Sequence, residues 1–195
     1  MIQKSPTEIA QELNQMFTGG KARITQTPGP AAPSTRKFYS THKGYDLAVP
    51  QGTEIKAPFA GEIVNSGLDK TGYGQRIGIY NPKTNQTYYL SHLSKIAAPT
   101  GVVQPGQTLG FSGGLPGTYG AGNTTGAHLD IEQYMGKMTK PVREAMSYAQ
   151  RIGAIVNPQS VLAKAKSIYG NNRVVAVSND PNKLKGMGRV VKITL

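Results

Sequence analysis

Short β-forming runs, separated by glycine and proline, fill the middle of the chain between residues 38 and 134. The chain carries 24 Gly and 13 Pro, which interrupt these runs so often that long helices have little room there. Strands are expected at residues 45–49, 53–56, 61–66, 75–80, 86–93, 108–111 and 127–132. Their lengths and spacing predict a mainly antiparallel β fold, a sandwich or an open barrel.

Helical signals flank this β region on both sides. On the N-terminal side, Ser5-Pro6-Thr7-Glu8 has the pattern of a helix start: a capping serine, a proline in the first turn and a glutamate that completes a capping box. The apolar stripe that follows consists of Ile9, Leu13, Met16 and Phe17. Such a stripe has to dock on another surface, by default on its own domain and otherwise on a partner.

The expected organisation of the chain has three parts. Residues 1–36 contain the first helix and a polar, proline-rich linker at 21–36. Residues 37–162 form the β domain, with a helical insertion at about 135–154. Residues 163–195 form a basic C-terminal extension.

The sequence after Tyr134 changes from β-like to helical patterns. Helices are expected at 141–152 and 158–169, followed by two strands at 174–177 and 189–195 around a polar loop. The last 25 residues could form a hairpin on the domain or add a strand to the sheet edge of a neighbour.

Positive charge is concentrated on the two flanks of the β region. Of the formal net charge of +12, residues 1–37 carry +3 and residues 135–195 carry +9, whereas residues 38–134 hold six basic and six acidic residues. Such flanks suit an anionic partner, either nucleic acid, a cell-wall polymer or an acidic protein, or they form a solvated basic surface. The basic residues are scattered and accompany no nucleic-acid motif.

The absence of cysteine excludes disulfides and thiolate metal sites. The N-terminal sequence lacks the long apolar core of a secretory signal, and no stretch approaches the roughly 18 apolar residues of a membrane span. We therefore expect a protein made in the cytoplasm without a signal peptide, which stays there or leaves by another route.

The chain's three histidines, at positions 42, 92 and 128, all lie in β segments beside glycine-rich turns. A single histidine is more often an ordinary hydrogen-bonded residue, but three in this setting favour a common site. Residues two apart on a strand share a face, so His128 and Asp130 project together. A hydrolytic zinc site needs about three protein ligands and an open position. His42, Asp46 and Asp130 could supply the ligands, leaving His92 and His128 for acid–base catalysis.

The segment "HKGYDLAVPQGTEIKAPFAGEIV" resembles the opening motif of lysostaphin-type (LytM-like) zinc endopeptidases, which reads His-x-Gly-x-Asp, Pro-x-Gly-Thr and Ala-Pro-x-x-Gly-x-Val. Further matches follow in the family's order: "GYGQRIGIY", "YYLSHLS", "VVQPGQTLGFSG" and "TTGAHLDIE", then "IVNPQSVL" after a detour. The resemblance covers more than half of the chain. Biotinyl and lipoyl carrier domains share "APFAGEIV" alone, but a carrier leaves the histidine pattern unexplained.

The resemblance implies an antiparallel β-sheet of the duplicated hybrid motif type, with a groove across it and one Zn²⁺ ion. It assigns His42 and Asp46 as zinc ligands and His92 and His128 as catalytic residues. The family's third ligand is the second histidine of a His-x-His pair, and Asp130 stands in its place. The glycine-rich stretch 110–127 corresponds to a wall of the family's substrate groove, where Tyr119 could contact a peptide.

Two alternatives follow from Asp130. In the first, its carboxylate binds the metal, giving a His-Asp-Asp set. Compared with the family's His-Asp-His set, this set polarises bound water less and admits Mn²⁺ or another oxygen-preferring ion more readily. In the second, the site is degenerate, and the domain binds a wall fragment or has a structural role.

The function expected from these features is zinc-dependent hydrolysis of peptide cross-bridges in bacterial peptidoglycan, at the cell wall after release or as part of a virion. The alternative is a degenerate peptidase-like module in a phage virion or tail, which contacts other virion proteins through the N-terminal helix and the basic extension.

Overall fold

The computed structural model describes residues 4–139, 175–177 and 191–193. The chain divides into two compact units, Met1–Lys137 and Met138–Leu195. The expected helices at 141–152 and 158–169 lie outside the described residues.

The N-terminal helix α1 spans Pro6–Thr18 and has the expected caps. The Ser5 hydroxyl accepts from the Glu8 amide, the Glu8 carboxylate accepts from the Ser5 amide at 2.7 Å, and Gly19 ends the helix in the left-handed region. These contacts satisfy amide groups that a helix start leaves without partners. No helix in the described part of the chain has the length and apolar character needed to span a membrane.

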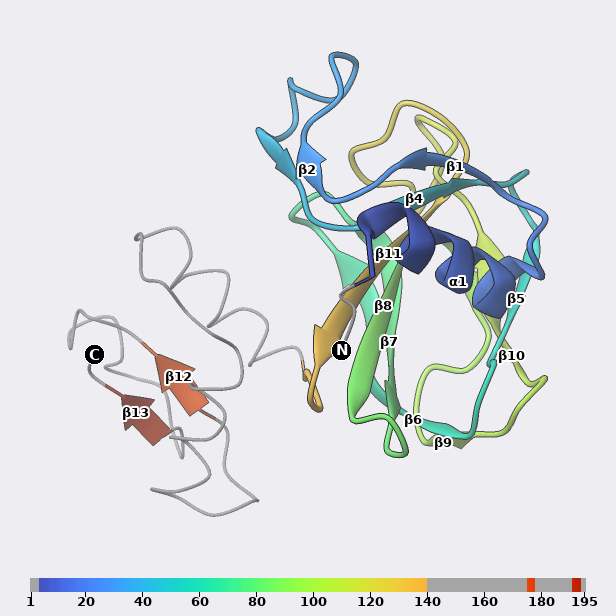
Figure 1. Ribbon diagram of the computed structural model, residues 1–195, viewed down its shortest axis with the longest axis vertical. Helices are drawn as coiled ribbons and strands as arrows, with labels where there is room; N and C mark the ends of the chain where they lie inside the picture. Colours follow the sequence, from blue (N-terminus) through green and yellow to red (C-terminus); the bar gives the residue numbers. More distant parts are fainter. Residues whose placement is uncertain (1–3, 140–174, 178–190, 194–195) are drawn as a thin grey trace. The chain divides into compact units, whose positions relative to one another are not determined.

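One antiparallel sheet dominates the first unit, which confirms the expected fold class (Figure 1). Its long path runs in the order β1-β4-β11-β8-β7-β6-β9, while β10 pairs with both β5 and β8. The strands are β1 (Arg23–Gln26), β4 (Tyr45–Ala48), β5 (Glu54–Lys56), β6 (Gly61–Asp69), β7 (Gly74–Asn81), β8 (Gln86–Ile96), β9 (Val102–Val103), β10 (Thr108–Ser112) and β11 (Leu129–Met135). A separate short ladder joins β2 (Gly29–Pro30) and β3 (Thr41–His42).

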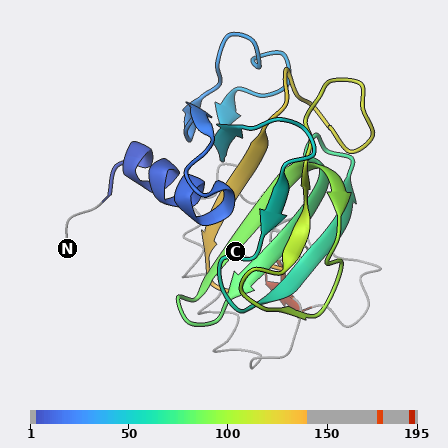
Figure 2. The ribbon, with the colours of Figure 1, turned by 90° about the vertical axis from the view of Figure 1, so that its right-hand side faces the viewer.

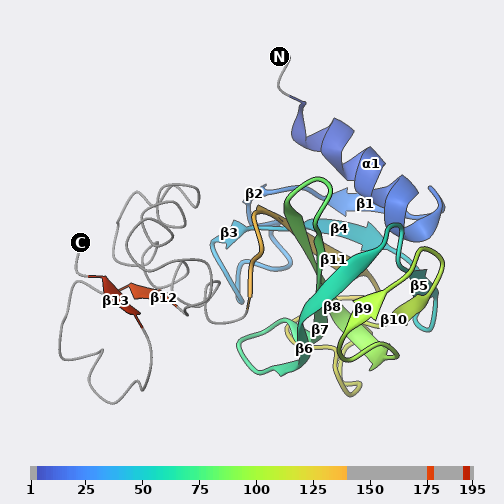
Figure 3. The same ribbon diagram turned by 90° about the horizontal axis from the view of Figure 1, so that it is seen from below.

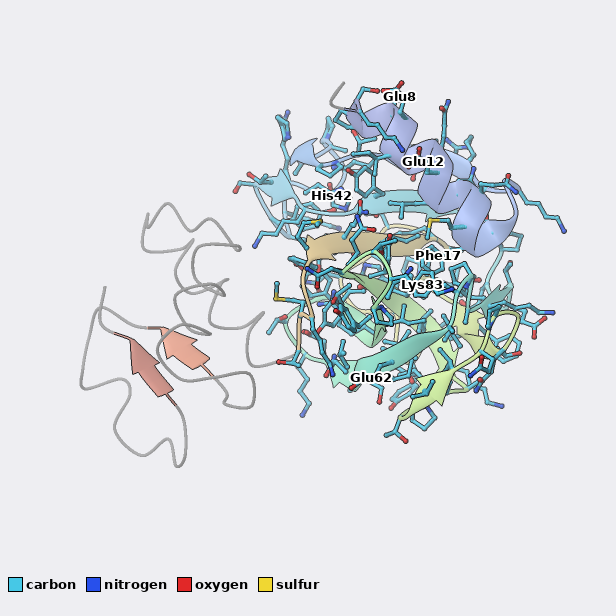
Figure 4. All side chains as sticks on the ribbon, turned by 60° about the horizontal axis from the view of Figure 1, so that its bottom comes forward. Glu8, Glu12, Phe17, His42, Glu62 and Lys83 are labelled. Carbon is cyan, nitrogen blue, oxygen red and sulfur yellow. The ribbon has the colours of Figure 1, made fainter. Side chains whose placement is uncertain are left out.

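The helix α1 packs its apolar stripe on its own unit. Figure 3 shows the helix beside β1. Leu13 and Phe17 are buried in the sheet's hydrophobic core, and the Phe17 ring centroid lies 5.6 Å from that of Tyr88. In Figure 4, Phe17 lies on the side of the helix that faces the sheet. The default expectation of docking on its own domain is confirmed, and these side chains are not available to a partner.

The expectation that 21–36 is only a linker is wrong. Residues Arg23–Gln26 form the edge strand β1, which pairs with β4 from Arg23↔Ala48 to Gln26↔Asp46. Strand β1 has only four residues and alternates weakly, so its pairing depends on the partner strand more than on its own pattern.

The second unit contains two described strands, β12 (Val175–Val177) and β13 (Val191–Ile193). They fall where late strands were expected, but they pair in parallel, which excludes a simple hairpin between them.

Candidate metal centre

Two aspartates face each other across neighbouring antiparallel strands. In the ladder between β4 and β11, Asp46 is directly opposite Asp130. Both side chains are buried, with relative exposures of 8% and 3%. Like charges directly opposite each other destabilise a sheet, and burial adds to that cost unless a cation lies between them.

His42 completes a cluster of three possible ligands with these aspartates. Its Nε2 lies 3.2 Å from Asp46 Oδ1 and 3.8 Å from Asp130 Oδ1. One ligand atom from each of the three residues lies within 4.8 Å of the other two. Two ligands held about 2.1 Å from a tetrahedral ion lie about 3.4 Å apart. The distances of 3.2 and 3.8 Å from His42 Nε2 to the two aspartate oxygens are close to that value.

The carboxylate oxygens nearest His42 lack hydrogen-bond partners among the described residues. Asp46 Oδ1 and Asp130 Oδ1 are both buried and accept no hydrogen bond there. Burial, followed by the charges of Asp46 and Glu132, raises the pKa of Asp130 well above its ordinary value. Buried acceptors of this kind are rare in folded proteins, and a divalent cation would satisfy both of them. The three side chains therefore fit a bound divalent metal ion, the ligand that their residue types imply.

Gly44 makes room for this arrangement in the turn between His42 and Asp46. A Cβ atom at position 44 would lie 1.9 Å from Asp130 Oδ1 and 3.1 Å from the Ile131 carbonyl oxygen. Every other residue type would therefore displace the Asp130 carboxylate, so glycine is required here for steric reasons.

We expect Gly44→Ala to weaken zinc binding by about 10–100-fold, as substitutions behind a ligand commonly do. The added methyl group would push the Asp130 carboxylate out of position. Isothermal titration of the metal-free protein with zinc measures the effect. Gly126→Ala is the matched control, because a Cβ there would meet no atom within 4 Å. Equal zinc affinity in Gly44→Ala and the wild type would contradict this steric role.

All three histidines direct Nδ1 to a backbone carbonyl. His92 Nδ1 lies 2.6 Å from the Ala121 oxygen, and His128 Nδ1 lies 2.7 Å from the Gly126 oxygen. His42 Nδ1 makes a longer approach, 3.4 Å, to the Thr27 oxygen. A ring nitrogen that faces a carbonyl carries the hydrogen, so each neutral imidazole keeps the lone pair of Nε2 for the site.

His92 and His128 form an adjacent pair next to the ligand cluster. Their ring centroids are 4.6 Å apart, and His128 Nε2 lies 3.6 Å from Asp46 Oδ1. Burial, with the neighbouring His128 as the second cause, lowers the pKa of His92 to about 4, so its imidazole is neutral at physiological pH. His92 also has a φ of 60°, a strained value for a residue with a side chain, and such strain is common at functional sites.

His42 differs in its protonation behaviour. Burial alone would lower its pKa, but the Asp46 carboxylate and then the Asp130 charge outweigh burial, and the net shift is upward. The Tyr39 ring stacks on the imidazole with 5.7 Å between centroids. His42 is thus held between an aromatic ring and two carboxylates.

A buried ion pair lies near the ligand cluster. Arg76 Nη2 lies 2.6 Å from Glu132 Oε2, and both residues are almost completely buried. The guanidinium carbon lies 4.0 Å from the Tyr73 ring centroid and 4.4 Å from that of Tyr89. The Tyr73 hydroxyl donates to Glu132 Oε1 at 2.9 Å. Since Glu132 is on the same strand and face as Asp130, this array supports the strand that presents the ligand.

The cluster opens into a groove of about 470 Å³. Its lining comes largely from the segments around β2 and before β11. Figures 1 and 2 show these segments at the same end of the sheet. Its lining includes all five site residues. The supposed linker and the loop after β2 contribute further lining residues: Gln26, Ala32, Ser34 and Thr35. His42 is the last residue of β3 and is labelled in Figure 4. Tyr119, a candidate peptide contact, is 74% exposed and lies outside this lining.

All five residues selected from the sequence meet at this site. Sequence reasoning missed the carbonyl groups of Thr27, Ala121 and Gly126, because backbone acceptors leave no side-chain signal. It also missed the pair of Arg76 and Glu132. Charged residues in the middle of otherwise apolar strands were the available signal for that pair.

An antiparallel β domain with a groove and a buried His-Asp-Asp cluster is the arrangement expected of a metal-dependent hydrolase. Comparison with known proteins narrows that class. The model of "Peptidase family M23" matches residues 40–143, and the chain belongs to this family.

Curated relatives include the DD-carboxypeptidase/endopeptidase Mpg of Neisseria meningitidis serogroup B, 36% identical over 106 residues. The match covers 54% of this chain and 23% of Mpg. Lysostaphin of Staphylococcus simulans is 35% identical over 94 residues, which cover 47% of this chain and 18% of lysostaphin. The chain thus matches less than a quarter of the length of either relative. The crystallised catalytic domain of lysostaphin from Staphylococcus simulans aligns with a TM-score of 0.52 at 27% identity, covering 67% of this chain and 88% of that domain.

Proposed function

We propose that this protein is a zinc-dependent endopeptidase that hydrolyses peptide cross-bridges of bacterial peptidoglycan. The observation that carries the proposal is the convergence of His42, Asp46 and Asp130 beside the imidazoles of His92 and His128. The relatives support a peptidase that acts on cell-wall peptides: they include a DD-carboxypeptidase/endopeptidase and the glycyl-glycine endopeptidase ALE-1 of Staphylococcus capitis.

The chemistry divides between three ligands and two imidazoles. His42, Asp46 and Asp130 would hold the ion. A bound zinc ion supplies a water molecule of lowered pKa and polarises the scissile carbonyl. His92 and His128 each direct Nδ1 to a loop carbonyl. In a neutral imidazole whose Nδ1 donates, Nε2 keeps its lone pair. Such a nitrogen can accept a proton from the attacking water and, once protonated, donate to the oxyanion or the leaving amine.

The lining of the groove fits an extended substrate. It includes residues of the loop after β2 and of the glycine-rich segment before β11, so a peptide laid across the site would contact both segments. Action at the cell wall, after release or as part of a virion, is the location that fits this substrate and remains a prediction from the sequence.

The test combines metal analysis with hydrolysis of bacterial walls. We expect one equivalent of divalent metal, clearing of walls that is lost with a chelator and restored by zinc, and new amino groups in the released fragments. His42→Ala should lose both metal and clearing. Metal-loaded protein that clears no walls, or clearing that survives complete metal removal, would overturn the proposal. Wall binding without clearing would support a non-catalytic module instead.

A further inference from the structure

We propose that Asp130 shifts the metal preference of this centre from Zn²⁺ toward oxygen-preferring divalent ions, with Mn²⁺ the ion it favours most in relative terms. The inference rests on the proposed metal binding but not on the proposed hydrolysis. It concerns the ratio of two affinities, and that ratio can be measured on the protein without any substrate.

The donor set is the first argument. Two of the three ligand atoms are carboxylate oxygens and one is an imidazole nitrogen. Imidazole nitrogen strongly favours zinc over manganese, whereas carboxylate oxygen suits manganese, magnesium and calcium. A histidine at position 130, as in the His-x-His pattern that this sequence resembles, would reverse the balance to two nitrogens and one oxygen.

The local charge is the second argument. Asp46 and Asp130 together carry the two negative charges that neutralise a divalent ion. The nearby positive charge of Arg76 is offset by two carboxylates, Glu132 at 2.6 Å and Asp69 at 3.7 Å. A centre of two carboxylates holds its ion mainly by charge, which differs little between divalent ions of similar size. The part of the affinity that depends on the chemical identity of the metal is therefore reduced.

The room around Asp130 is the third argument. Its Oδ1 lies 3.8 Å from His42 Nε2, slightly farther than Asp46 Oδ1 at 3.2 Å. The absent side chain of Gly44 leaves the space that this carboxylate occupies. The oxygen ligand is thus accommodated by the neighbouring chain, and no described donor competes for it.

The experiment measures Mn²⁺ and Zn²⁺ binding to metal-free wild type and to Asp130→His. Bound Mn²⁺ loses the six-line electron paramagnetic resonance signal of the free ion, and added Zn²⁺ restores that signal as it displaces manganese. We expect stoichiometric Mn²⁺ binding by the wild type, and a ratio of Zn²⁺ to Mn²⁺ affinity that is at least about tenfold higher in Asp130→His. A ratio that is equal or lower in Asp130→His would overturn the inference.

Two further variants complete the design. Asp130→Asn keeps an oxygen donor and removes the charge, so we expect weaker binding of both ions with a ratio nearer to that of the wild type. Asp46→His makes the same donor exchange on the facing strand, so the inference is tested even if Asp130→His does not fold. Wild type that binds both ions but cleaves no peptide would refute the proposed function alone, whereas an unchanged ratio with active enzyme would refute this inference alone.

Discussion

Replacement of His128 by alanine is expected to lower the rate of wall hydrolysis by about 10²–10⁴-fold, the range typical for loss of a general acid or base. The expectation follows from its place: Nε2 lies 3.6 Å from Asp46 Oδ1, and the ring is held by the Gly126 carbonyl. Because His128 is outside the ligand set, the metal content of the variant should stay at the wild-type value. Paired measurements of metal stoichiometry and hydrolysis rate test both statements.

The control for this variant is Tyr119→Ala. Tyr119 is highly exposed on the glycine-rich segment and lies outside the groove lining, so hydrolysis should remain close to that of the wild type. If His128→Ala hydrolysed walls at the wild-type rate, His128 would have no catalytic role. If it lost the metal as well, His128 would have to be reassigned to the ligand set.

Replacement of Arg76 by methionine is expected to lower the free energy of unfolding by about 3–5 kcal/mol, as removal of one partner from a buried ion pair commonly does. The variant would leave the Glu132 carboxylate in the protein interior without its 2.6 Å partner. It would also remove a guanidinium that packs on the rings of Tyr73 and Tyr89. Urea denaturation of metal-free protein measures the loss.

Two controls separate burial from charge. Lys137 and Glu62 also form a contact of 2.6 Å, but their side chains are 43% and 46% exposed. Lys137→Met should therefore change stability by less than about 1 kcal/mol. The double variant Arg76→Met, Glu132→Leu removes both buried charges and should recover much of the lost stability. Equal losses from Arg76→Met and Lys137→Met would contradict the importance of burial.

The sequence predicted the β region well because glycine and proline mark the ends of its strands. Each strand expected between residues 45 and 132 is present, and the bounds differ by a few residues. It predicted the capping box for the same kind of reason, since Ser5 and Glu8 act on their own backbone. Local rules succeed where the contacts themselves are local.

The features that the sequence did not predict depend on contacts between residues far apart in the chain. The supposed linker became strand β1 and a wall of the groove, because its short polar sequence pairs with β4 and has no strong preference alone. Arg76 and Glu132 are 56 positions apart, and their pairing depends on the registers of β7, β8 and β11. Asp130 was recognised as a ligand candidate, but only the facing register showed that it lies directly opposite Asp46.

The carbonyl groups that hold the imidazoles come from Thr27, Ala121 and Gly126, in segments outside the long strands of the sheet. Chimeras whose exchanged segments displace these carbonyls would therefore alter which ring nitrogen carries hydrogen, even when every histidine is retained. A successful graft of new specificity onto this scaffold has to preserve three peptide oxygens as carefully as it preserves the five side chains.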